Sequence, residues 1–178
     1  VDGVEHIVSE NKTINEYTNG KISKKTNKIT AYNDAAKKES REVVEEYNAD
    51  GKLTKKTTST DTYSGENVSA REKLIEAYDD NGRLINQENA KYDADGGVLN
   101  TIATTRTVKT NFIYDTQHMQ KLISFDADIY KRNKSGEEEL EKTETITRMR
   151  VYDLLSKEES AVNAEQAASS NVYSLEKG

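Results

Sequence analysis

Tyrosine recurs along this chain of 178 residues at nearly constant intervals. The first six of the ten tyrosines lie 14 to 16 residues apart, and seven of the nine glycines follow a tyrosine by two to six residues. The chain contains no proline, so glycine, asparagine and aspartate have to mark its turns. Tyrosine and glycine therefore define one repeating unit, and this repeat constrains the fold more than any other feature of the sequence.

Three copies of the unit share the pattern Tyr-[Asn/Asp]-x-[Asp/Asn]-Gly-x-[Leu/Val]. An Asn or Asp at the first turn position can accept a hydrogen bond from the backbone two residues on, and glycine adopts positive φ without steric cost. The pattern predicts a type I turn closed by a glycine bulge, which is a common β-hairpin connection. Each tyrosine would then face an aliphatic residue across the hairpin. The predicted pairs and turn glycines are Tyr47 with Leu53 around Gly51, Tyr78 with Leu84 around Gly82, and Tyr92 with Val98 around Gly96.

The spacing of the repeat also sets the length of the strands. With about four residues in each turn, a pitch of about 15 residues leaves strands of about 11 residues, or about 36 Å. Leu, Ile, Val and Phe together form less than a fifth of the chain, which is too little for a deep core. We therefore expect an all-β fold, an antiparallel meander of about ten strands in long hairpins, whose sheet is thin or partly single-layered and either open or curled.

Two segments carry the clearest apolar alternation, and we expect them to hold most of the core: residues 98–114 and 119–129. Residues 35–47 are ambiguous, because they combine good helix formers with apolar residues at helical spacing. Their ending matches the hairpin entry before Tyr78, so a strand is the preferred interpretation and a helix is the alternative.

A different pattern closes the chain. Residues 156–169 predict a C-terminal α-helix, with a serine cap and two glutamates in the first turn. The expected organisation is a β-meander with Tyr/Gly hairpin repeats over residues 1–155, followed by a helix and tail over residues 156–178.

The segment from Tyr78 to Leu84, Tyr-Asp-Asp-Asn-Gly-Arg-Leu, resembles the YD repeat of RHS-type and teneurin-type proteins, and it is also similar to MORN-like repeats of bacterial proteins. The resemblance covers three copies between residues 47 and 98 and implies β-hairpins. Closed shells in the YD family need many more repeats, so encapsulation is not implied. In composition and strand length the chain is similar to spirochaete outer-surface lipoproteins, which implies a single-layer meander with a C-terminal helix.

Composition excludes several kinds of site. The absence of cysteine excludes disulfides, thiolate nucleophiles and zinc ribbons. The longest apolar runs are far too short for a membrane-spanning helix. An isoelectric point near 5.1 with only scattered lysine pairs argues against nucleic acid as a partner. His6 and His118 match no metal-binding spacing, and no pair of carboxylates stands out as an acid–base couple, so we expect neither a catalytic site nor a cofactor.

The acidic turns are the only candidate metal sites. Oxygen-bearing side chains alternate before a glycine there, as at the opening of a calcium loop. Each turn lacks the third oxygen ligand and the glutamate that closes such a loop, and hairpin turns need the same residue types for backbone reasons. We therefore expect plain turns without calcium at the three pairs Asn48 and Asp50, Asp79 and Asn81, and Asp93 and Asp95.

These features favour a non-catalytic module at a bacterial cell surface or outside the cell, with any export signal already removed. A thin sheet is poorly suited to a water-excluded pocket, but it offers a wide surface and free edges to a protein partner or to another copy by strand addition. One alternative is a carrier of lipids or other hydrophobic ligands, and another is a binding protein of the immunity or antitoxin type. The carrier would have a half-barrel groove lined by Ile102, Phe112, Ile123, Phe125 and Ile129.

Overall fold

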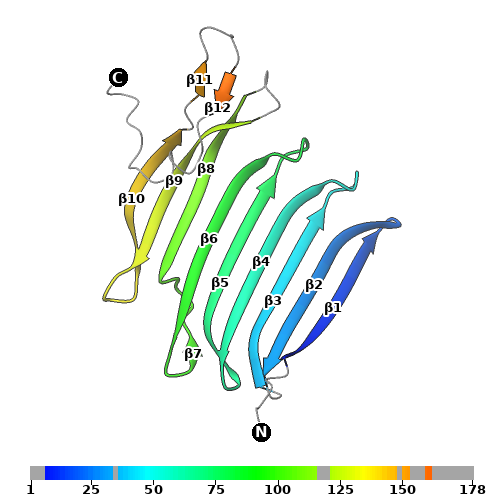
Figure 1. The fold of residues 1–178 in the computed structure, drawn as a ribbon, viewed down its shortest axis with the longest axis vertical. Coiled ribbons are helices and arrows are strands. Elements are labelled where there is room, and N and C mark those ends of the chain that lie inside the picture. The colour runs from blue at the N-terminus through cyan, green and yellow to red at the C-terminus, as the bar shows by residue number, and fades with distance from the viewer. Residues whose placement is uncertain (1–6, 34–35, 116–120, 148–149, 153–158, 162–178) are drawn as a thin grey trace.

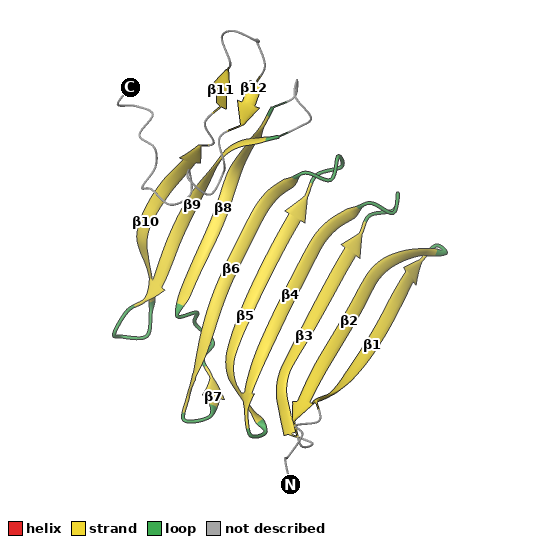
Figure 2. Cartoon of the chain, viewed as in Figure 1, coloured by secondary structure: helices red, strands yellow, loops and turns green. Residues whose placement is uncertain are grey.

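The computed structural model describes residues 7–33, 36–115, 121–147, 150–152 and 159–161, and every regular element in these ranges is a β-strand (Figures 1 and 2). One antiparallel sheet contains ten of them, and nine follow one another in chain order across it from β1 to β10, with the short β7 paired to β6. The predicted all-β antiparallel meander is therefore confirmed. Its strands are β1 (Ile7–Thr18), β2 (Lys21–Asn33), β3 (Ala36–Tyr47), β4 (Leu53–Ser64), β5 (Asn67–Tyr78), β6 (Leu84–Asp95), β7 (Val98–Leu99), β8 (Thr105–Tyr114), β9 (Leu122–Arg132) and β10 (Glu138–Thr147).

Strand β3 settles the ambiguous segment. Its residues are good helix formers, yet Ala36–Tyr47 is extended and is paired along its length with β2 and β4. The helix alternative is wrong because pairing on both sides satisfies the backbone of this segment, and tertiary context overrides a weak local propensity.

The C-terminal segment differs from the meander. Short strands β11 (Arg150–Tyr152) and β12 (Glu159–Ala161) pair with each other as a separate two-stranded sheet. Apart from residues 159–161, the helix predicted over 156–169 lies outside the described residues, and the division at residue 155 stays a prediction.

Two of the predicted hairpin turns have the expected chemistry. Gly51 N–H donates to the Asn48 carbonyl at 2.9 Å, and the Asn48 side-chain oxygen accepts from the backbone N–H groups of Asp50 and Lys52, each at 3.0 Å. The turn at Asp79 repeats every one of these bonds, and the glycines of both turns have positive φ. Tyr47 lies across from Leu53 and Tyr78 lies across from Leu84, as the pattern predicts.

The prediction for the third copy is wrong. Strand β6 continues past Tyr92 to Asp95, which is the residue that pairs with Val98. The turn consists of Gly96 and Gly97, both with positive φ. Two consecutive glycines permit a two-residue hairpin, so the strands extend further and Tyr92 pairs with Arg71 on β5 instead. The turn that does repeat the chemistry of the first two begins at Asn133 and ends at Gly136.

Successive tyrosines lie on opposite faces and at opposite ends of the sheet. Tyr92 pairs with Arg71, which lies seven residues before Tyr78 along β5. Because side chains alternate along a strand, an odd separation puts Tyr78 on one face and Tyr92 on the other. Tyr63 shares the face of Tyr92, because Asp61, two residues before Tyr63 and on the same face of β4, pairs with Arg71, which in turn pairs with Tyr92. A bulge adds one extra residue to the strand next to each Tyr–Leu pair. Because side chains alternate along a strand, this extra residue puts the tyrosine at the other end of that strand on the opposite face of the sheet.

The sheet has very little core. Among the described residues no large side chain is fully buried, and the buried apolar residues are all alanine: Ala90, Ala103 and Ala127. The closest aromatic packing is between Phe112 on β8 and Phe125 on β9, whose rings stack with centroids 5.4 Å apart. The thin sheet expected from the composition is therefore present, and its best apolar packing lies in the segments that the alternation pattern indicates.

The turn geometry predicts a graded response to substitution at Gly82. No atom lies within 4 Å of a Cβ added there, so only the positive φ of 76° opposes a side chain. We expect Gly82→Ala to lower the free energy of unfolding by about 1–2 kcal/mol, which is the cost of left-handed backbone for an L-residue. Gly82→Asn should lose less, because asparagine tolerates this conformation. Urea unfolding measures both, and equal stability of wild type and the alanine variant would contradict the turn.

Candidate functional site

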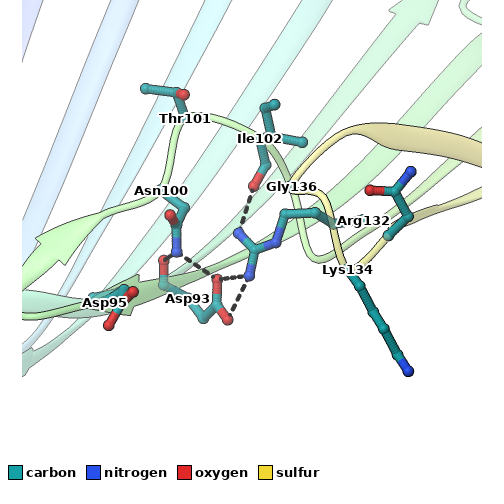
Figure 3. A pocket seen from close by; sticks show the side chains of 10 residues that line it. Asp93, Asp95, Asn100, Thr101, Ile102, Arg132, Lys134 and Gly136 are labelled. Atoms are coloured by element: carbon teal, nitrogen blue, oxygen red, sulfur yellow. Dashed lines mark hydrogen bonds and ion pairs between the residues drawn. The ribbon is translucent and has the colours of Figure 1, made fainter.

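A polar cluster lies where β6, the loop between β7 and β8, and β9 meet (Figure 3). Arg132 donates through Nη2 to both carboxylate oxygens of Asp93, at 2.6 and 2.8 Å, and through Nη1 to the carbonyl of Ile102 at 3.2 Å. Asn100 donates from its side chain to the Asp93 carboxylate at 3.0 Å. These bonds fasten the loop between β7 and β8 to strands that are distant in sequence.

The electrostatics of this cluster fit a structural role. The hydrogen bond from Arg132 lowers the pKa of Asp93 from 3.8 to about 2, with a further contribution from Asn100. A carboxylate with so low a pKa is a poor base at neutral pH, and both of its oxygens are already occupied. The side chain of Arg132 is only 19% exposed, so the guanidinium is engaged with the loop and not free for a ligand. The cavity is thus held together by paired charges.

The candidate calcium oxygens are distributed along the sheet. Asn48 and Asp79 use their side-chain oxygens to close their own turns, and Arg83 also donates to Asp79 at 2.7 Å, which lowers the pKa of that carboxyl. Asp50 and Asn81 lie exposed at the tips of these turns, while Asp95 ends β6. Within the described ranges, no three His, Cys, Asp or Glu side chains are grouped in a way that could hold a metal ion.

The residues of the predicted hydrophobic groove are only partly together. Phe125 and Ile129 are separated by an even number of residues along β9 and share a face, and Phe112 stacks on Phe125. Ile123 lies at a register shift between β8 and β9, where the simple alternation is interrupted. Ile102 lies in the loop at the opposite end of β8 from Phe112, next to Arg132. The amine of Lys109 is 5.0 Å from the Phe125 ring centroid, and burial lowers its pKa. A lysine therefore lies over the aromatic pair where an apolar ligand would bind.

Equivalent side-chain hydrogen bonds recur every two strands across the sheet, a repeat that the turn motif alone did not reveal. The amine of Lys21 donates to the carbonyl of Ala49, and the amine of Lys52 donates to the carbonyl of Asp80, each at 2.8 Å. Each bond links a hairpin tip to the equivalent tip two strands away. The signal in the sequence is a cation directly after glycine at an interval of 31 residues, at Lys21, Lys52 and Arg83.

Tyr78 belongs to the same end of the sheet. Leu53 and Lys56 line a shallow hollow with it, in a position equivalent to that of Ile22 beside Tyr47. Burial raises the pKa of Tyr78 to about 12, with a further contribution from Glu76. Burial also raises the pKa of Tyr47, so both tyrosines stay neutral, and the Tyr47 hydroxyl donates to Glu45 at 2.9 Å.

The most exposed part of the described sheet is its β1 edge. Residues 8–18 are all exposed, and they include three large hydrophobic side chains, Val8 at 61%, Ile14 at 45% and Tyr17 at 62%. On its inner side β1 pairs with β2, which leaves half of its backbone donors and acceptors facing outward. Such an edge is a template for another strand.

Comparisons with protein families, with characterised proteins and with solved structures find no match to this chain. The resemblance to YD or MORN-like repeats therefore stays a prediction. No helix of the described residues is long and apolar enough to cross a membrane.

The Asp93–Arg132 pair predicts a pH-dependent contribution to stability. A lowered pKa means that the ionised form is stabilised by folding, so the contribution is complete above the ordinary value of 3.8 and is lost as the pH falls towards about 2. We expect Asp93→Asn to melt below wild type at neutral pH, and the gap to close over that acid range. Asp95→Asn, at an exposed carboxylate two residues along, is the control. A gap that persists unchanged at low pH would contradict the ion pair.

The turn hydrogen bonds predict indifference to calcium. The oxygens of Asn48 and Asp79 are engaged by backbone N–H groups of the same turns. We expect the melting temperature in chelator-treated buffer to be the same before and after addition of millimolar Ca²⁺, with Mg²⁺ as the control for ionic strength. A rise specific to Ca²⁺ would show that the turns bind the metal.

Proposed function

We propose that this chain is a non-catalytic structural and interaction module that binds a protein partner, or a second copy of itself, by adding a strand to its sheet. The single observation that carries the proposal is the open sheet of very little core, ending in a long exposed edge strand. Such a sheet presents more surface per residue than a compact domain and leaves backbone hydrogen-bonding groups free at its edge.

The polar clusters support a role other than catalysis. Catalytic sites place reactive groups in a concave, water-excluded space and perturb their pKa values towards the working pH. The cavity beside Asp93 instead holds a carboxylate whose pKa lies far below neutrality, tied to an arginine. Tyr78 has a pKa of about 12, which is equally far from a working pH. Both of these pKa shifts keep the group in one form at neutral pH: Asp93 stays ionised and Tyr78 stays neutral.

The chemistry of β1 supports strand addition. All twelve residues of β1 pair with β2, with one register shift near Glu16. The outer side of β1 is therefore long and largely regular. No proline interrupts it, since the chain has none. Proline and bulges are two of the devices that block pairing at edges, and over most of its length β1 lacks both.

We further propose that the module is displayed outside the cell or at a cell surface. The support is the similarity in composition and strand length to spirochaete outer-surface lipoproteins, together with an open β-meander of the kind that this likeness implies. Long strands rich in polar and charged side chains suit an exposed location.

Amide hydrogen exchange at low and high protein concentration tests the proposed self-association. We expect slower exchange at high concentration in an edge strand, β1 or β10, with unchanged exchange in the central strand β4. The reason is that only edge amides lack a partner in the isolated sheet. Identical exchange at both concentrations in all strands, together with a monomeric mass at protein concentrations up to about 1 mM, would contradict self-association. A dissociation constant of about 1 mM corresponds to a binding free energy of only about 4 kcal/mol.

A further inference from the structure

The direction of the two edge strands limits how copies of this sheet can join. Nine strands alternate in direction from β1 to β10, so the two edges run the same way, as their arrows in Figure 1 show. A head-to-tail join of β10 to β1 of another copy, without rotation, would therefore be parallel. Two β1 strands related by a two-fold axis perpendicular to the sheet pair antiparallel, as every neighbouring pair in the described sheet does.

We propose that β1 pairs with β1 of a second copy, antiparallel and with Asn11 opposite Asn11 on the two-fold axis, to give a closed dimer with one continuous sheet. This inference rests on the proposed function and names its partner and register. Strand direction gives the symmetry, and the side chains of β1 give the register.

Like charges exclude the two longest symmetric registers. The even-numbered residues of β1 share a face, and a perpendicular two-fold axis keeps that face on the same side in both copies. Centring the pair on Lys12 puts the two lysines directly opposite each other. Centring it on Thr13 puts Glu10 opposite Glu16 twice. Like charges directly opposite each other are destabilising in a sheet.

The register centred on Asn11 has complementary pairs. It puts Glu10 opposite Lys12 twice and Val8 opposite Ile14 twice, which covers the exposed aliphatic side chains of Val8 and Ile14. The register centred on Ile14 also pairs opposite charges, Lys12 with Glu16, but Glu16 already forms an ion pair with Lys24 at 3.1 Å, and Val8 would stay outside the junction. Glu10 accepts a hydrogen bond from the neutral hydroxyl of Tyr32 at 2.9 Å, which leaves its charge without a cation there. The Asn11 register therefore covers more of the exposed aliphatic surface.

Neighbours on β2 favour the same register. Lys12 lies directly across from Lys28, so in the isolated sheet its nearest cross-strand neighbour carries the same charge. A Glu10 carboxylate from the second copy would relieve that repulsion. Val8 lies across from Tyr32, so the new Val8–Ile14 contacts would extend an apolar row that already exists on this face.

Charge exchange in the full chain tests the inference. We expect wild type to dimerise in sedimentation velocity, and Lys12→Glu or Glu10→Lys alone to weaken the dimer about tenfold or more, because each change creates two like-charge pairs. An equimolar mixture of the two variants should form a heterodimer, since both of its junction pairs are then of opposite charge. Lys38→Glu and Glu66→Lys, which change exposed residues away from β1, are the matched controls and should dimerise as wild type does.

Each other outcome separates this inference from the proposed function. Single variants that dimerise as well as wild type would overturn the β1 junction but leave association through another edge. Single variants that dissociate and are not restored by mixing would overturn the Asn11 register. A wild-type chain that stays monomeric at every concentration would overturn both the inference and the proposed self-association. Circular dichroism confirms that each variant keeps its strands.

Discussion

The rest of this structure depends on cross-strand pairing within one sheet. Among the described residues no large side chain is fully buried, so the strands cannot be stabilised mainly by a packed interior. Stability must come from ladder hydrogen bonds, from side-chain pairs across neighbouring strands and from turns that fix the register. This explains why charged and threonine-rich strands such as β4 can form the middle of the sheet, since Lys and Thr stems supply enough contact for a half-exposed surface.

The turns give the sheet its regularity. Each asparagine or aspartate that opens a type I turn is followed by a glycine, and the bulge beside the Tyr–Leu pair moves the next tyrosine to the other face. The lateral unit is therefore two strands, and the bonds from Lys21 and Lys52 tie equivalent tips of adjacent units together. Each face of the sheet thus receives tyrosine side chains, one face at one end of the sheet and the other face at the opposite end.

Local chemistry was predictable from the sequence and distant contacts were not. The turns at Asn48 and Asp79 and the strand over 36–47 follow from residues within a few positions of one another. The third copy failed because Gly96 and Gly97 allow a shorter turn than the motif implies. The turn at Asn133 was missed because the preceding tyrosine, Tyr130, lies three residues before it, whereas Tyr47 and Tyr78 come directly before their turns. The Asp93–Arg132 pair joins residues 39 positions apart, and no local pattern marks it.

Methyl and aromatic nuclear Overhauser contacts in solution test the central claim most directly, namely that a single sheet without a covering layer carries the fold. The account predicts contacts between side chains of adjacent strands, such as Tyr78 with Leu84 and Phe112 with Phe125, and none between strands that are far apart in the sheet, such as β2 and β8. Contacts between β2 and β8 in the monomer would show a second layer folded over the first and would contradict the account.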